Sequence, residues 1–299
     1  MPSAFSMFHP LHRRLPLSSA GCIALTLIVI QTLFGSLDSR ADQLTVAVPE
    51  ITWRENLYDS PRPFAFLLRS SVFETLLKES THGGWSLGIA SAAQSSADGM
   101  SWQFSLRTGR RFSSHAPVST ADVVSSLEFC KSRGAHDFEV SAIREGTVSV
   151  RRGKEMSADA LLSVFCSCPI VEKRSREIFG SHFGSGTHFV GSGPYRIVEF
   201  QEQQRIFLER REGPPGAQRI EIKSYPEPTQ ALTSLRLGGL DISFSVSDEV
   251  LERARKDETL QVAECSIFYV VFRQGLSLNC GQAIDIANVA YQSQSPRGS

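Results

Sequence analysis

The sequence has no excess of charge of either sign, because 31 lysines and arginines are matched by 31 aspartates and glutamates in 299 residues. The basic residues also form no long block. A protein that binds nucleic acid needs a positive surface to contact the phosphates. The charge pattern therefore excludes nucleic acid as an expected partner. Apolar residues make up 41% of the chain, enough to form the core of one large domain or two smaller ones.

Motifs for catalysis and phosphate binding are absent as well. The chain contains no Gly-x-Ser-x-Gly turn, no His-Glu-x-x-His pair and no cysteine–histidine signature of nucleophilic catalysis. The glycine-rich stretch 180–193 lacks the Lys-Ser/Thr ending of a phosphate-binding loop. It also precedes a strand pattern, whereas a loop that cradles an anion opens a helix. We therefore expect neither an enzyme nor a bound cofactor.

Soft metal ligands are few and poorly spaced. Cys166, Cys168, His182 and His188 lie in one short segment, but their Cys-x-Cys and His-x5-His spacing fits no zinc pattern. We expect no metal site and keep an exported metal-binding protein as a minor alternative. Five of the six cysteines follow residue 41, which leaves at least one of them unpaired, and the sequence does not decide the disulfide connectivity.

The apolar run near the N-terminus, 20–34, falls short of the roughly 20 residues that a helix needs to span a bilayer. Arg13 and Arg14 precede this run, and the small-x-small tripeptide 39–41 follows it, which is the pattern of a secretory signal peptide. We expect cleavage after Ala41 and a periplasmic mature protein. An uncleaved signal that anchors the protein is the alternative.

The rest of the chain mixes strand and helix patterns, which predicts an α/β or mixed α+β fold. The β-branched run 44–48 predicts a first strand, and the apolar spacing over 64–78 predicts a buried helix. The remaining expected elements are two strands in 137–153, a helix in 157–165 capped by Ser157, two strands in 194–211, a strand in 217–226, and a helix, Gly-Gly break and strand in 228–246.

The segment 96–129 carries the most specific pattern. An Asp-Gly pair predicts a tight turn, apolar–polar alternation predicts a strand with one buried face, and a serine three residues before an aspartate predicts a capped helix start. The residues are Asp98 and Gly99 for the turn, Trp102, Phe104 and Leu106 for the strand, Ser119 and Asp122 for the cap, and Val123, Val124, Leu127 and Phe129 for the buried helix face.

Together these pieces resemble the extracytoplasmic solute-binding proteins of ABC transporters, in the peptide/nickel-type family (family 5). The resemblance covers about residues 44–245 and rests on the stretches 72–77, 98–112, 119–124, 191–195 and 239–242, in the family's order. It implies a structural role, in a subdomain that buttresses the first lobe or in turns and strand entries, for the matching residues. These are Asp98, Gly99, Phe104, Leu106, Arg107, Gly109, Phe112, Ala121, Asp122, Val123, Gly191, Gly193, Pro194, Tyr195 and Asp241.

The resemblance implies capture of a small solute, such as a peptide, in the periplasm and its delivery to the membrane permease of an ABC importer. It places the loop after the first strand and the strand that crosses between lobes against the solute. The candidate binding residues are therefore Glu50, Trp53, Tyr58, Phe268 and Tyr269. Core or hinge packing is the alternative for Trp53 and Tyr269. A basic cluster formed by Arg107, Arg110 and Arg111 is expected to be a solvated face.

Family members are longer, and the resemblance implies that the second lobe is missing here. The expected domains are a signal peptide at 1–41, a first lobe at 42–265 with a structural subdomain at about 80–180, and the start of the crossover at 266–299. Two-lobed binders trap ligands by hinge closure, so a single lobe would bind differently. The alternative function is a truncated or degenerate exported scaffold that acts as an interaction module without solute capture.

Overall fold

The computed structural model describes residues 43–52, 62–79, 84–134, 136–180, 183, 188–211, 216–265, 268–277 and 290–291. They belong to a folded unit that spans Ala41–Ser299. Across these ranges, no helix has the length and apolar character that a membrane span requires. The predicted signal peptide, residues 1–41, lies outside them.

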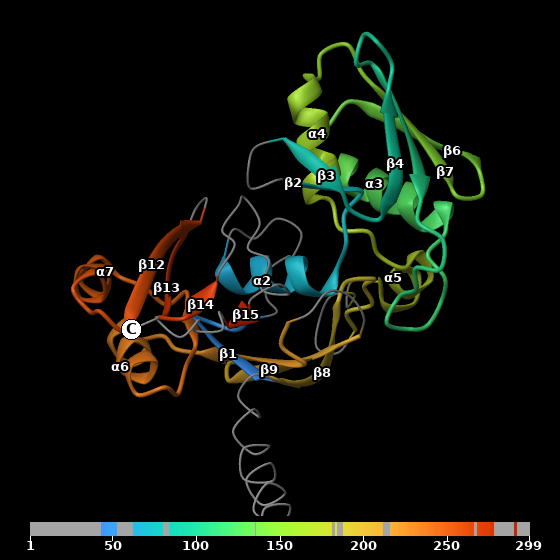
Figure 1. Cartoon of the computed structure of the whole chain (residues 1–299). Coiled ribbons are helices and arrows are strands. Elements are labelled where there is room, and N and C mark those ends of the chain that lie inside the picture. Colours follow the sequence, from blue (N-terminus) through green and yellow to red (C-terminus); the bar gives the residue numbers. More distant parts are fainter. Residues whose placement is uncertain are drawn as a thin grey trace, which may run out of the picture. The chain divides into compact units, whose positions relative to one another are not determined.

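A seven-stranded sheet organises the chain, with the strand order β12-β13-β11-β1-β10-β9-β8 (Figure 1). β1 is parallel to β10 and β11, and the other neighbouring pairs are antiparallel. The strands are β1 (Gln43–Val48), β8 (Tyr195–Gln201), β9 (Arg205–Arg210), β10 (Arg219–Ser224), β11 (Ile242–Ser243), β12 (Leu260–Cys265) and β13 (Phe268–Arg273). Parallel neighbours joined through helices are the signature of an α/β layer arrangement.

Helices cover both faces of this sheet because successive side chains of a strand point to opposite faces. Val46 and Val48 of β1 pack in one core with α2 (Pro63–Val72). Ala47, between them, packs in the other core with α6 (Pro228–Arg236) and α7 (Asp248–Arg255). The predicted mixed α/β class is confirmed.

A separate core lies in a second sheet, with the order β4-β5-β7-β6. α3 and α4 pack against this sheet, and the buried residues of its core run from Leu76 to Ile170. The elements are β4 (Ala90–Ser95), β5 (Ser101–Leu106), α3 (Thr120–Gly134), β6 (Phe138–Arg144), β7 (Thr147–Arg152) and α4 (Ala158–Ser167). The remaining short elements are β2 (Leu77–Glu79), β3 (Trp85–Leu87), α5 (Lys173–Phe179), β14 (Leu276–Ser277) and β15 (Ala290–Tyr291).

The predicted hairpin and helix cap are confirmed. Trp102, Phe104 and Leu106 of β5 are all buried. At the start of α3, the Ser119 hydroxyl and backbone N–H donate to the Asp122 carboxylate at 2.6 and 2.9 Å. The backbone N–H of Asp122 donates in return to the Ser119 hydroxyl at 3.4 Å, so the pairing is reciprocal and satisfies a free backbone N–H of the first turn. The expected burial of all four apolar helix residues is only partly confirmed, because Val124 and Phe129 stay partly exposed while Val123 and Leu127 are fully buried.

The helix predicted over 64–78 is shorter than expected. α2 ends at Val72, because Phe73 adopts an extended conformation with φ −113° and ψ 160°. The chain then leaves the first core, and Leu76 and Leu77 pack in the second one. The apolar spacing of this stretch is therefore the sum of two separate burial patterns, which periodicity alone does not distinguish from one long helix.

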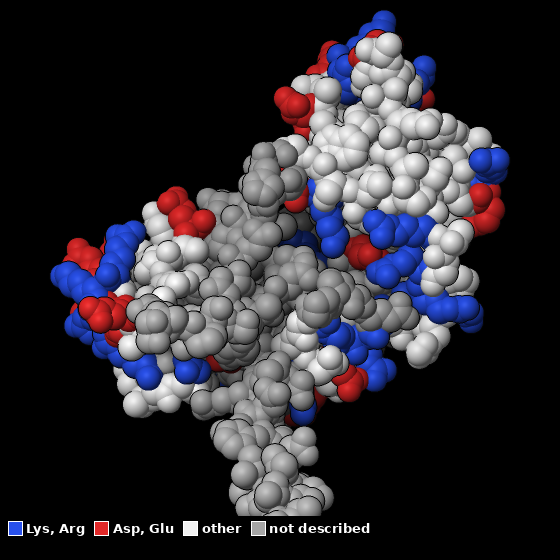
Figure 2. Space-filling view, in the orientation of Figure 1, with Lys and Arg blue, Asp and Glu red and all other residues white. Residues whose placement is uncertain are grey.

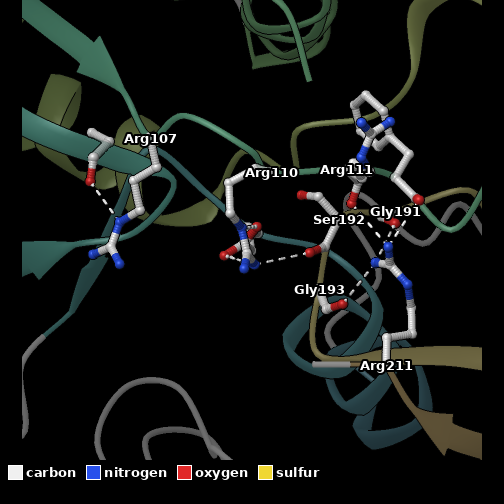
Figure 3. Close-up of polar contacts among 10 residues, drawn as sticks. Arg107, Arg110, Arg111, Gly191, Ser192, Gly193 and Arg211 are labelled. Atoms are coloured by element: carbon white, nitrogen blue, oxygen red, sulfur yellow. Dashed lines mark hydrogen bonds and ion pairs between the residues drawn. The ribbon is translucent and has the colours of Figure 1, made fainter. Parts of the chain in front are cut away.

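A partly buried ion pair connects the two cores (Figure 3). The Arg110 guanidinium donates to both carboxylate oxygens of Glu74, at 3.2 and 2.6 Å, and to the carbonyl of Ser192 at 3.2 Å. The Arg110 side chain is 26% exposed and that of Glu74 is 10% exposed. Charge-assisted, bidentate bonds of this kind are the stronger hydrogen bonds in proteins. Arg110 therefore ties the segment after β5 to the segments that enter and leave the second core.

Arg211 reinforces the same junction from the first sheet. It donates to the backbone carbonyls of Arg111, Phe112, Gly191 and Gly193 at 2.8–3.4 Å (Figure 3). Arg107 and Arg111 also donate to backbone carbonyls, and both stay exposed. The expectation of a solvated basic face thus holds for these two residues. The expectation is wrong for Arg110, because its guanidinium is paired with the nearly buried carboxylate of Glu74.

The glycines of the junction are required by close packing. A Cβ on Gly191 would lie 2.0 Å from the Val72 carbonyl oxygen, and one on Gly193 would lie 2.5 Å from the Val72 carbonyl carbon. The Gly193 N–H donates to that same carbonyl oxygen at 2.8 Å. The loop therefore packs directly on the end of α2, which only a residue without a side chain permits.

One disulfide staples the second core. Cys130 of α3 and Cys168 at the end of α4 are bonded, with their Cα atoms 6.1 Å apart. Cys166 has a free thiol, and burial, with a smaller contribution from the charge of Glu79, raises its pKa from 9.0 to about 11. A thiol with such a pKa is a poor nucleophile at neutral pH. Cys166 is therefore an inert packing residue.

We predict that Arg110→Met destabilises the chain by about 2 kcal/mol, since it leaves the nearly buried Glu74 carboxylate without its cation. Urea unfolding of the whole chain measures this loss. Arg107→Met is the matched control, with an expected loss below about 1 kcal/mol, because Arg107 is exposed and donates to a neutral carbonyl and not to a buried carboxylate. Adding Glu74→Gln to Arg110→Met should recover part of the loss. Equal losses for the two arginine variants would contradict the assignment.

We also predict that the Cys130→Ser/Cys168→Ser double variant loses about 4 kcal/mol of unfolding free energy, from the loop entropy released by opening a 38-residue separation. Urea unfolding again provides the measurement. The control is Cys166→Ser, which removes a similar sulfur atom without opening a loop and should cost clearly less. If the double variant unfolds at the same urea concentration as the parent chain, the disulfide contributes no stability.

Candidate functional site

The parallel strands β1, β10 and β11 end at the same edge of the seven-stranded sheet. Val48 pairs with Ser224, and Ala47 pairs with Ser243, so the chain leaves all three strands side by side. Sheets of this kind bind ligands in the crevice at the carboxyl ends of their strands. The segments 49–52, 225–226 and 244–246, which follow the three strands, form the candidate site and are called the carboxyl edge below.

Hydrogen bonds between neighbouring segments hold the carboxyl edge in place. The backbone N–H of Tyr225 donates to the carbonyl of Val48, and that of Phe244 donates to the carbonyl of Ala47, both at 2.8 Å. The buried Ser245 hydroxyl donates to the carbonyl of Tyr225 at 2.5 Å. The edge is therefore preformed, and little conformational entropy would be lost when a ligand contacts it.

One ion pair stands at this edge. The Glu50 carboxylate, in the segment after β1, accepts a hydrogen bond from the guanidinium of Arg62, just before α2, at 2.5 Å. Both side chains are about half exposed. An exposed pair contributes little to stability, so its partners can be exchanged for those of a ligand at low cost. The pair offers one anionic and one cationic group to a solute.

The structure places the predicted binding residues unevenly. Glu50 lies at the carboxyl edge. Tyr269 lies in β13 and is 40% exposed, but its ring is beside the guanidinium of Arg255 of α7, 5.9 Å from the ring centroid. Trp53 and Tyr58 lie outside the described residues, as does the side chain of Phe268. The register places Glu50 and Tyr269 at the same edge of the sheet, because Ala47 pairs with Ser243 and Ser243 pairs with Val271 of the antiparallel β13.

Sequence reasoning missed Arg62, Tyr225 and Ser245. Arg62 precedes a proline, and proline is favoured in the first turn of a helix. That signal could have located the start of α2 and, with it, the arginine opposite Glu50. The other two residues reach the edge only because β10 and β11 flank β1. No local pattern reveals that pairing.

The residues of the resemblance lie away from the carboxyl edge. Asp241 precedes β11 at the opposite end of the sheet, where its carboxylate accepts the backbone N–H of Thr45 at 2.8 Å. The Tyr195 hydroxyl donates to the carbonyl of Ala217 at 2.6 Å and is buried. The residues of the resemblance from Asp98 to Val123 belong to the second sheet, to α3 and to the turns that connect them. Gly191 and Gly193 belong to the junction of the two cores. A structural role for these residues stays a prediction of the resemblance.

One of the four soft metal ligands in the segment 166–188 forms a disulfide. The Cys168 thiol is consumed by the disulfide with Cys130. The His188 ring stacks on Phe179, with the ring centroids 4.3 Å apart. Within the described part of the chain, no group of three or more His, Cys, Asp and Glu side chains is placed to hold a metal ion.

Solved structures with the same fold match about three quarters of this chain. They include MoaA from A. tumefaciens R10 with mannopinic acid (19% identity, TM-score 0.65, 75% of this chain and 49% of that chain). The oligopeptide-binding protein AppA from Bacillus subtilis with a nonapeptide matches with 19% identity and a TM-score of 0.64, over 74% of this chain and 47% of that chain. NikZ from Campylobacter jejuni with Ni(L-His) matches with 20% identity and a TM-score of 0.62, over 75% of this chain and 47% of that chain. The periplasmic-binding-protein-like fold is thus confirmed, and the chain spans about half the length of these structures.

A comparison with curated proteins finds no match. The family described as bacterial extracellular solute-binding proteins, family 5 Middle, matches residues 85–284, which is more than half of the chain. The matched range contains the hairpin, the capped helix and the Gly-Ser-Gly-Pro-Tyr turn from which the resemblance was drawn. The chain therefore belongs to the bacterial extracellular solute-binding proteins of family 5.

Proposed function

We propose that this chain is the solute-binding component of an ABC importer and that its carboxyl edge forms a wall of the solute site. The observation that carries the proposal is the common edge of β1, β10 and β11, in a chain of a solute-binding family. Binding would be reversible and non-covalent. Delivery to the membrane permease would follow from docking of the loaded protein.

We further propose a peptide-like solute. A peptide carries an ammonium group at one end and a carboxylate at the other, and the Glu50–Arg62 pair offers a matching anion at the carboxyl edge and a cation beside it. Two structures with the same fold bind peptides, the nonapeptide of AppA and the peptide STSA of DppA from Helicobacter pylori. The other solutes named above, mannopinic acid and Ni(L-His), define the competing chemical classes.

Isothermal titration calorimetry of the chain with trialanine tests the proposal. We expect saturable binding, and a loss of about fivefold in affinity for Glu50→Gln and for Arg62→Gln, because each variant removes one partially exposed charge-assisted contact. Glu139→Gln is the matched control, since Glu139 forms an exposed pair with Arg151 on the second sheet, at 3.0 Å. Its affinity should equal that of the parent chain.

The same titration with mannopinic acid and with Ni²⁺ plus L-histidine identifies the solute class. Saturable binding of one of these, with no response to trialanine, would replace the peptide by that class. Absence of saturable binding for all three would contradict solute capture and favour the exported scaffold that acts as an interaction module.

We also propose that the chain is exported to the periplasm and cleaved after Ala41, which the N-terminal sequence pattern supports. The intact mass of the protein recovered from the periplasmic fraction measures the cleavage. We predict a mature chain that starts at Asp42. A mass that includes residues 1–41, recovered from the membrane fraction, would contradict cleavage and favour the anchored form.

A further inference from the structure

A groove lies between α7 and the outermost strand of the large sheet, β12. Its volume is about 400 Å³, and its lining consists of Ala254, Arg255, Leu260, Val262, Glu264 and Tyr269. It lies on the face of the sheet that α6 and α7 cover, beside the side of β12 that pairs with no other described strand. Its open end, at Glu264 and Tyr269, lies at the same edge of the sheet as the carboxyl edge, because β12 runs in the same direction as β11. The groove itself extends from there between β12 and α7, and it shares no residue with the segments that define the carboxyl edge.

The floor of the groove follows from the alternation of β12. Leu260, Val262 and Glu264 point to the same face, since they are two residues apart. Exposure increases along this row, from the buried Leu260 through the partly exposed Val262 to the exposed Glu264. Tyr269 is the direct cross-strand partner of Glu264. The groove therefore has an apolar end and an open end with an aromatic ring and a carboxylate.

Two opposite charges open onto this groove without a salt bridge. The Arg255 guanidinium lies over the Tyr269 ring, 5.9 Å from its centroid. Throughout the described ranges, neither Arg255 nor Glu264 has an ion-pair partner. Other charges nearby are paired, for example Arg253 with Glu249 at 2.5 Å. Figure 2 shows acidic and basic side chains intermixed over α7, and in that setting an unpaired cation and an unpaired anion on one groove are a distinct feature.

We propose that this groove is a second binding site, for a zwitterion of α-amino-acid size with an apolar side chain. The ligand carboxylate would bind Arg255, the ammonium group would bind Glu264, and the side chain would cover Val262 and the Tyr269 ring. A volume of about 400 Å³ lies within the range of about 300–1,000 Å³ found for small-molecule sites. Both charges would gain charge-assisted bonds that the protein itself does not supply.

Three probes with the same side chain test the charge requirement: L-leucine, L-leucinamide without the carboxylate, and N-acetyl-L-leucine without the ammonium group. The measurement is a titration of the ¹⁵N-labelled full chain, followed by amide chemical shifts. We expect L-leucine to shift the amides of Val262, Glu264 and Tyr269 to saturation. Each of the other probes should bind at least fivefold more weakly.

Two variants then assign each charge to its partner. Arg255→Gln should remove the advantage of L-leucine over L-leucinamide and leave L-leucinamide binding unchanged. Glu264→Gln should remove the advantage over N-acetyl-L-leucine and leave that probe unchanged. Both side chains are exposed, so the variants should fold. Arg253→Gln, two residues before Arg255 on the same helix, is the control and should leave all three affinities unchanged.

Equal affinity for the three probes would overturn the proposal, as would saturable shifts confined to residues outside the groove. The result is independent of the proposed function. Loss of trialanine binding in Glu50→Gln concerns the carboxyl edge alone, and the charge requirement of the groove is measured at β12 and β13. Each proposal can therefore fail while the other stands.

Discussion

The parallel pairing of β1 with β10 on one side and β11 on the other determines both the carboxyl edge and the two covered faces of the large sheet. It aligns three chain segments at one edge, with their backbone groups bonded to one another, and it gives β1 a buried residue on each face of the sheet. At the other end of the same pairing, the Asp241 carboxylate binds the backbone of β1 and lies 3.5 Å from the Arg273 guanidinium. A preformed edge and two helix-covered faces thus have one origin.

Part of the fold was predictable from interactions between residues that are close in sequence. The turn at Asp98-Gly99, the alternation in β5 and the cap of α3 depend on residues a few positions apart, and the structure has all three. The shortened α2 was not predictable in the same way, because a helical spacing of apolar residues does not say which core each residue enters. Assigning Leu76 to the second core requires knowing that a second core begins there.

The candidate site shows the same division between local and distant information. Glu50 was selected because the resemblance places the loop after the first strand against the solute, and that strand was predictable from local sequence. Arg62 pairs with Glu50, and Ser245 bonds to the carbonyl of Tyr225, only because the folded chain brings these segments together. Tyr269 was selected for its place in the crossing strand, yet its ring lies beside Arg255. The strand position of an aromatic residue does not tell which face of the sheet its ring occupies.

The junction of the two cores also bears on the order in which this chain acquires its structure. Glu74 and Ile170 form a bridge, so the second core is a continuous stretch of sequence whose two ends meet. Its contacts are closer together in sequence than those of β1, whose partners β10 and β11 are synthesised only after that stretch is complete. Long-range strand pairing is slow, and an unpaired strand is prone to aggregation while it waits. β1, the earliest described strand in the sequence, is therefore among the last to pair. Folding of this chain should depend on keeping β1 from aggregating until β10 and β11 are available.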